Sequence, residues 1–378
     1  MNRKTFLQKS TLLALGASTL LSSSCSDDDN KNPSNTTVIA PNVHTSKSKS
    51  YKWKMVTTFP PNFPILGESA NLFAEWVKVL TDGRIDIKVY GAGELVPALE
   101  VFDAVSSGTV EMGNGTSFFW SGKLAAAPFF TAVPFGMNAQ QMQSWLINSD
   151  GYELWKEAYS PFNLIPFLGG STGVQMGGWF RKEINSIADI KGLKMRMPGL
   201  GGKVLEKAGA TAMVTAGSEI YTNLEKGVID ATEWVGPYHD YLMGFHKIAP
   251  YYYSPGWHEP SGQTEFTIHK PTYEQLPTDL QEALFTASMR IQAWMLGEFD
   301  RQNSLYLAKI LQEGKVKMRT FPKDVLDQFR VLAKEVVEEV VEGDAMSRKV
   351  YDSYQAFQKL TNPWYDLTEG AYHGLIKG

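Results

Sequence analysis

The chain has 378 residues, enough for two domains with cores of their own, and its 43% hydrophobic and 12% aromatic content is that of a globular protein. The formal net charge is −4 and the sequence has no basic stripe, which excludes a nucleic-acid-binding protein. The many Trp, Tyr and Phe residues suit an enclosed pocket for a small organic ligand as well as an ordinary core.

Residues 1–25 have the pattern of an export signal. Basic residues precede an apolar run at 11–21, which is too short to span a bilayer, and small residues follow it up to Cys25. Cys25 is the only cysteine, so disulfides within the chain are excluded. Its position resembles a bacterial lipobox, and residues 3–7 resemble a twin-arginine signal. We therefore expect a periplasmic protein, which lipidation of Cys25 would anchor to a membrane.

Residues 26–50 are polar and predict a flexible tether. An α/β domain is expected over 51–168, because hydrophobic patterns typical of strands and helices alternate there. The expected strands are 51–59, 85–90, 110–113 and 163–167, and the expected helices are 70–80, 96–106 and 138–159. Phe118 and Trp120 follow the third strand, where they would either wall a ligand pocket or pack in the core.

A second α/β domain is expected over 169–270. Arg196 lies near the end of the expected strand 193–198, and Glu233 and Trp234 end the strand that begins at 228. In open α/β sheets, ligands bind outside the carboxyl ends of strands. Trp257 and Glu259 end a further β-like run, and 263–269 alternates like a strand. A buried Arg at such an end would hold an anion, and an exposed one would reach into solvent.

From 271 to 378 the chain is rich in helical periodicity. Helices are expected at 274–311, 325–342 and 347–360. A helical segment of this length could brace both domains or mediate self-association as a homodimer.

The polar residues at the strand ends predict one of two kinds of site. If the ends converge, Arg196 can bind a carboxylate, while the oxygens of Gln175, Glu233 and Glu259 are the hard ligands that sodium or calcium prefers. The same two glutamates could instead be the general acid and base of a secreted carbohydrate-active hydrolase. The sequence has no nucleophile elbow and no zinc-ligand spacing to support an enzyme.

Five segments of the mature chain, together with the export signal, resemble the extracytoplasmic solute-binding subunit of tripartite ATP-independent periplasmic (TRAP) transporters. They are residues 91–97, 173–181, 192–196, 229–237 and 249–253. The resemblance is greatest to the branch that binds 2-oxo monocarboxylates with a cation. It implies two α/β domains of the periplasmic-binding-protein kind, a long helix across both, closure over the ligand, and no enzymatic activity. It also implies delivery to the small and large membrane subunits of the permease.

The resemblance further implies roles for single residues. Arg196 matches the arginine that grips the carboxylate, and Gln175, Glu233, Trp234 through its backbone carbonyl, and Glu259 match the cation ligands. We expect the substrate contacts to come from a wider set: Arg196, Gln175, Phe118, Trp120, Trp234 and Trp257. The expected ligand is a small 2-oxo or 2-hydroxy monocarboxylate bound with sodium or calcium. The alternative is a sugar acid or dicarboxylate bound without metal.

Two positions depart from the pattern of the 2-oxo acid branch. Phe118 and Phe119 stand where this branch has tyrosines, which removes hydroxyl groups from the pocket. His258 stands where a second tryptophan is expected, next to Glu259.

Overall fold

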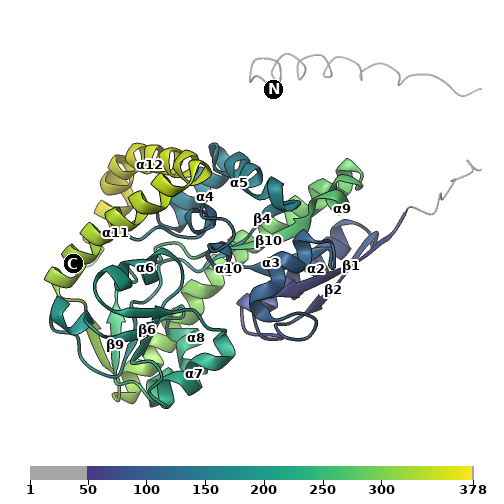
Figure 1. Ribbon diagram of the computed structural model, residues 1–378. Coiled ribbons are helices and arrows are strands. Elements are labelled where there is room, and N and C mark those ends of the chain that lie inside the picture. Colours follow the sequence, from purple (N-terminus) through teal and green to yellow (C-terminus); the bar gives the residue numbers. More distant parts are fainter. Residues whose placement is uncertain (1–48, 377–378) are drawn as a thin grey trace, which may run out of the picture. The chain divides into compact units, whose positions relative to one another are not determined.

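The computed structural model describes residues 49–376, so the expectations for the export signal, for Cys25 and for nearly all of the tether lie outside the described residues. Two sheets dominate the described part, and long helices contact both of them (Figure 1). The expected two-sheet α/β fold is confirmed.

The first sheet has five strands in the order β2-β1-β3-β10-β4. Their bounds are β1 Tyr51–Thr57, β2 Ile85–Tyr90, β3 Met112–Gly115, β4 Leu164–Ser171 and β10 Gln263–His269. β1 is parallel to β2 and β3, whereas β10 is antiparallel to β3 and β4. The strand 263–269, which we expected in the second domain, therefore belongs to the first sheet. Phe266 and Ile268 place it there, because they pack in the same core as Met55 and Met112.

The second sheet has six short strands in the order β11-β9-β5-β8-β6-β7. Their bounds are β5 Gly178–Phe180, β6 Lys194–Arg196, β7 Thr211–Met213, β8 Ala231–Thr232, β9 Tyr251–Ser254 and β11 Lys317–Thr320. β6 is parallel to β7 and β8, so the carboxyl ends of β6 and β8 lie side by side. β11 brings part of the helix-rich C-terminal third into this sheet through parallel pairing with β9. The domain boundaries expected at 168 and 270 stay predictions.

The helices follow the hydrophobic periodicity of the sequence. Their bounds are α2 Leu66–Leu80, α3 Val101–Ser106, α4 Ala139–Asn148, α5 Gly151–Tyr159, α6 Gly199–Lys207, α7 Gly217–Glu225, α8 Pro237–Leu242, α9 Lys270–Glu274, α10 Thr278–Glu313, α11 Lys323–Gly343, α12 Ala345–Tyr365 and α13 Ala371–Leu375. The single helix expected over 138–159 is divided, because Ser149 has an extended backbone and ends α4. In residues 49–376, no helix combines the length and the apolar character needed to cross a bilayer.

The 36-residue helix α10 connects the two sheets. It contacts β4 and α2 on the side of the first sheet and α8 on the side of the second. Leu284, Ile291 and Met295 pack in the core of the first sheet, while Ile310 packs with Trp179 and Tyr252 of the second. The chain also passes between the sheets after β4 and again before β10, so several segments must bend together if the sheets move.

Candidate functional site

A small pocket lies where strand ends of both sheets meet the two crossing segments. Its cavity volume is about 30 Å³. This is room for about two or three water molecules. Its lining residues are Phe59, Leu66, Thr116, Phe118, Phe119, Thr172, Gln175, Arg196, Glu233, Trp234, Val235, Glu259, Gly262 and Thr264. The structure thus brings together six of the residues predicted from the sequence: Phe118, Gln175, Arg196, Glu233, Trp234 and Glu259.

Parallel pairing of two short strands places Arg196 beside Glu233. Arg196 is the last residue of β6 and pairs with Thr232, the last residue of β8, so Glu233 follows directly at the same sheet edge. The Arg196 guanidinium Nη1 donates to the Glu233 carboxylate and also to the Glu233 backbone carbonyl, at 3.0 Å. Arg196 is only 2% exposed, so it is held inside and does not reach into solvent. Its Nε–H has no protein partner within the described residues and is available to an anion.

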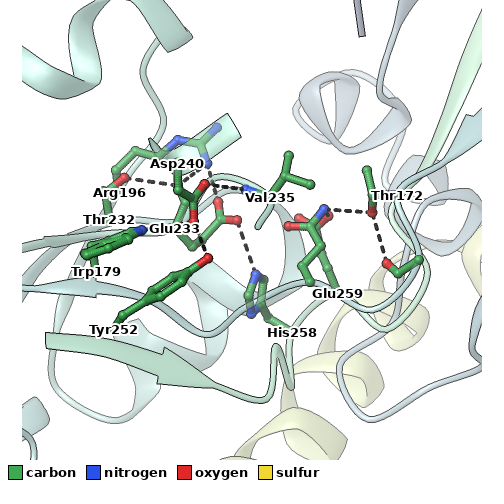
Figure 2. A network of polar contacts seen from close by, with 12 residues as sticks. Thr172, Trp179, Arg196, Thr232, Glu233, Val235, Asp240, Tyr252, His258 and Glu259 are labelled. Atoms are coloured by element: carbon green, nitrogen blue, oxygen red, sulfur yellow. Dashed lines mark hydrogen bonds and ion pairs between the residues drawn. The ribbon is translucent and has the colours of Figure 1, made fainter. Parts of the chain in front are cut away.

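His258 contacts the other oxygen of the same carboxylate. Its Nε2 lies 3.2 Å from Glu233 Oε2, and Figure 2 shows Glu233 between Arg196 and His258. The imidazole is buried, which is unusual for a histidine in a loop and places it within the site. The Arg196 guanidinium also lies 5.1 Å from the centre of the Trp234 ring, a cation–π contact. Glu233 is therefore oriented from two sides.

Glu259 and Gln175 form the second polar group of the pocket. Gln175 Nε2 donates to Glu259 Oε2 at 2.7 Å and to Thr172 Oγ1 at 3.1 Å. Burial, followed by the nearby Glu233 carboxylate, raises the pKa of Glu259 well above its usual range, although Arg196 acts in the opposite direction. A second cation near these carboxylates would relieve that repulsion.

The oxygen atoms around Glu259 fit a hard cation. One ligand atom each from Glu233, His258 and Glu259 lie within 4.8 Å of one another, and all three residues are buried. Gln175 Oε1 is buried and has no hydrogen-bond partner within residues 49–376, which leaves its lone pairs for a ligand. Carboxylate and amide oxygens are the donors that sodium and calcium prefer.

Asp240 fixes the segment that carries Glu233 and Trp234. It lies in the first turn of α8 and accepts hydrogen bonds from Trp179 Nε1 at 2.9 Å, Tyr252 OH at 2.7 Å and the Val235 N–H at 3.3 Å (Figure 2). Burial raises the pKa of Asp240 to about 7, while these three donors act in the opposite direction. The sequence analysis did not identify Asp240, although its place three residues after Pro237, in the first turn of a helix, was a usable signal.

Two tryptophans predicted to contact the substrate lie outside the pocket lining. The Trp120 indole turns away from the pocket and donates to Glu265 at 2.6 Å. The Trp257 ring stacks on Phe329, with ring centres 4.5 Å apart. Both are buried in the core that includes Phe102 and Phe329, and the substrate contacts expected for them stay predictions.

Several lining residues escaped prediction. Phe59 follows β1 and Thr116 follows β3, so the rule that ligands bind at the carboxyl ends of strands would have found both. Thr172 lies in a crossing segment, and Thr264 lies inside β10. Neither of these threonines has a local sequence signal.

Comparisons with known proteins identify the family of this chain. A family model described as "Bacterial extracellular solute-binding protein, family 7" matches residues 55–344. A monocarboxylate 2-oxoacid-binding periplasmic protein of Nostoc sp. is 40% identical over 325 residues, which are 86% of this chain and 88% of that protein.

Two solved structures are similar over nearly their whole length. A TRAP periplasmic solute-binding protein from Pseudoalteromonas atlantica, with bound sodium and pyruvate, is 42% identical with a TM-score of 0.84, covering 86% of this chain and 99% of that one. A TRAP transporter solute-binding protein from Bordetella bronchiseptica is 38% identical with a TM-score of 0.85, covering 87% and 97%. The latter is described as a mixed-occupancy dimer, with calcium and picolinate in one site and the other site empty. The chain therefore belongs to family 7 of the bacterial extracellular solute-binding proteins, the DctP family of TRAP periplasmic solute-binding proteins.

Proposed function

We propose that this protein captures a small 2-oxo or 2-hydroxy monocarboxylate together with sodium or calcium outside the cytoplasm and delivers it to the membrane subunits of a TRAP permease. The observation that carries this proposal is a buried arginine whose Nε–H has no partner among residues 49–376. It lies in the same small pocket as two carboxylates and an amide oxygen that also lacks a partner among those residues. A single ligand with a carboxylate and a neighbouring oxygen satisfies both groups. The family consists of binding proteins, so the hydrolase alternative for Glu233 and Glu259 falls away.

Each chemical group of the ligand has a counterpart in the pocket. The ligand carboxylate would accept hydrogen bonds from the Arg196 guanidinium, whose Nε–H has no partner within the described residues. Gln175, Glu233, Glu259 and the Trp234 backbone carbonyl would hold the cation, whose charge offsets that of the two glutamates. The pyruvate and picolinate named for the two solved relatives share a carboxylate next to a second donor atom. That shared feature supports a ligand which contacts arginine and cation at once.

The volume of the pocket favours a short acid. Space for two or three waters suits an acid of a few carbon atoms, and the apolar side chains of Phe118, Phe119 and Val235 suit a short hydrocarbon group. A sugar acid would need more room and more hydroxyl partners than this lining offers. The metal-free alternative for a larger acid or dicarboxylate is therefore the weaker one.

Closure over the ligand follows from the origin of the lining residues. Thr116 and Phe118 follow strand β3 of the first sheet, while Arg196 ends β6 and Glu233 follows β8 of the second. A ligand that contacts both groups stabilises the conformation in which they are close. Hinge closure is the mechanism by which we expect the permease to distinguish the loaded from the empty protein.

We further propose that the protein forms a homodimer through its C-terminal helices. Leu360, Trp364, Leu367 and Leu375 are more than 70% exposed on α12 and the helical turns after it, and an exposed apolar surface of this kind is typical of an interface. The relative from Bordetella bronchiseptica is described as a dimer, which supports a dimeric state without indicating its interface. Light scattering of the mature protein tests it: we expect the mass of a dimer for the unaltered chain and of a monomer for Trp364→Glu.

Anchoring through a lipidated Cys25 stays part of the proposal, on the lipobox-like pattern alone. Labelling with a lipid precursor would detect the modification, and a Cys25→Ser variant would be the control. Release of the unaltered protein in a soluble, unlabelled form would contradict it.

Thermal denaturation with a panel of acids tests the binding function. Ligands that bind only the native state raise the melting temperature. We expect pyruvate or lactate to raise it in sodium or calcium and to lose this effect in chelator and potassium. A rise with glucuronate alone, indifferent to cations, would favour the metal-free alternative.

A further inference from the structure

A further buried carboxylate lies directly behind the pocket. Glu265 of β10 is fully buried, and its side chain accepts three hydrogen bonds from neutral groups: Ser117 Oγ at 2.9 Å, Trp120 Nε1 at 2.6 Å and Tyr159 OH at 2.8 Å. Thr264, the residue before it, lines the pocket. Because successive side chains of a strand point to opposite faces, β10 presents Thr264 to the ligand and Glu265 to the core behind it.

Two of the three donors belong to the turn that forms the aromatic wall of the pocket. Ser117 and Trp120 are the first and last residues of the 3-10 turn Ser117–Trp120, and Phe118 and Phe119 between them line the pocket. The third donor, Tyr159, is the last residue of α5, and no residue of α5 lines the pocket. The carboxylate therefore holds both ends of the wall from behind and ties it to a rigid helix.

An irregularity in the sheet lies directly beside Glu265. The pairing of β10 with β4 shifts register between Thr264, opposite Gly170, and Glu265, opposite Leu168, so Gly169 has no partner across the ladder. A Cβ at Gly169 would lie 2.7 Å from the Glu265 backbone, so a side chain there would displace the strand. The extra residue belongs to β4, so this bulge leaves the alternation of β10 intact and brings the β4 backbone close to Glu265.

The Glu265 carboxyl group offers two acceptor oxygens to three converging donors: Oε2 accepts from Ser117 and Tyr159, and Oε1 accepts from Trp120. A glutamine has one acceptor oxygen and would turn its amide N–H groups toward the remaining donors, and an apolar residue would leave all three unpaired. Burying a carboxyl group without a cation is unfavourable. The benefit of Glu265 therefore lies in orienting the three groups that donate hydrogen bonds to it. We propose that Glu265 is a positioning residue that fixes the Phe118 and Phe119 wall and thereby sets which acyl groups the pocket accepts. This inference rests on the proposed binding of a small acid.

The test compares affinities for a short and a branched 2-oxo acid. Calorimetric titrations with pyruvate and with 4-methyl-2-oxopentanoate, both in calcium, give the ratio of the two affinities for the unaltered protein and three variants. Glu265→Gln and Ser117→Ala loosen the wall and are expected to lower the preference for pyruvate by about fivefold or more, the equivalent of one hydrogen bond. Tyr159→Phe removes a donor outside the wall. It is the matched control, expected to lower the melting temperature while keeping the ratio within about twofold.

The outcomes separate this inference from the proposed function. If the unaltered protein binds neither acid, the proposed function is wrong and the inference falls with it. If the unaltered protein binds pyruvate and Glu265→Gln keeps the same ratio, only the positioning role is refuted. Equal shifts of the ratio in Tyr159→Phe and Ser117→Ala would also refute it, because a general core role would then explain both.

Discussion

Replacing Arg196 by methionine is expected to abolish most of the affinity for a carboxylate. Methionine keeps much of the length and apolar surface of the side chain but has no donor for an anion. Two charge-assisted hydrogen bonds of about 1.5–3 kcal/mol each amount to roughly 3–6 kcal/mol, which raises Kd about 10²–10⁴-fold.

The same variant also disturbs the protein itself. Glu233 is 1% exposed and would keep only the contact with His258, so we expect the free energy of unfolding to fall by about 3 kcal/mol. Adding Glu233→Gln removes the stranded charge. The double variant should regain much of the stability without regaining affinity.

Titration calorimetry with pyruvate in calcium, together with urea unfolding, measures both effects. Arg319→Met is the control, because Arg319 pairs with Glu183 in a partly exposed position away from the pocket and should leave Kd unchanged. A Kd for Arg196→Met within about threefold of the unaltered value would refute the role of Arg196. So would a double variant that binds pyruvate normally.

Three further predictions follow from single contacts. Glu259→Gln should weaken calcium more than sodium, because it removes a full charge from the cation ligands; equal losses in calorimetry would contradict this. Burial raises the pKa of Glu265 from 4.5 to about 7, so the native state keeps this proton to higher pH than the unfolded chain. Stability should then fall as pH rises from about 4.5 to 7, by up to ~3 kcal/mol, and Glu265→Gln should flatten this part of the profile in urea unfolding. Gly170 has φ 119°, and a Cβ there would collide with Met295. Gly170→Ala should therefore lower the free energy of unfolding, measured in urea, by at least ~2 kcal/mol. Gly297 lies in open space on α10, so Gly297→Ala should be neutral or slightly stabilising in the same measurement.

Local pattern predicted most of the fold. Helical periodicity located α2, α10, α11 and α12, since each buries one stripe of apolar residues. It could not place β10, whose membership of the first sheet depends on pairing with strands about 100 and 150 residues earlier in the chain. Its alternating pattern predicts a strand but carries no information about the partner.

The residues of the site likewise include some that the sequence could predict and some that it could not. Arg196 and Glu233 were predictable because each stands at the end of a strand, where the carboxyl edges of a parallel pair meet. The positions of Trp120 and Trp257 outside the pocket lining could not be predicted, because composition cannot tell which face of a turn an indole takes. The Trp120 indole is oriented by its hydrogen bond to the buried Glu265 carboxylate, and the Trp257 indole by its stack on Phe329. His258 departs from the family pattern, and its contact with Glu233 could be found only in the structure.

The most direct measurement is a calorimetric titration of pyruvate into the mature protein under three conditions: calcium, sodium, and chelator with neither ion. Because Arg196 and the oxygens of Gln175, Glu233 and Glu259 line one small pocket, acid and cation should bind as a pair. We expect saturable binding of one pyruvate per chain with either ion, and a Kd at least tenfold weaker in chelator, about 1.4 kcal/mol. Equal affinity under all three conditions would show that the carboxylates do not hold a cation for the ligand, and no binding under any of them would contradict the proposed function.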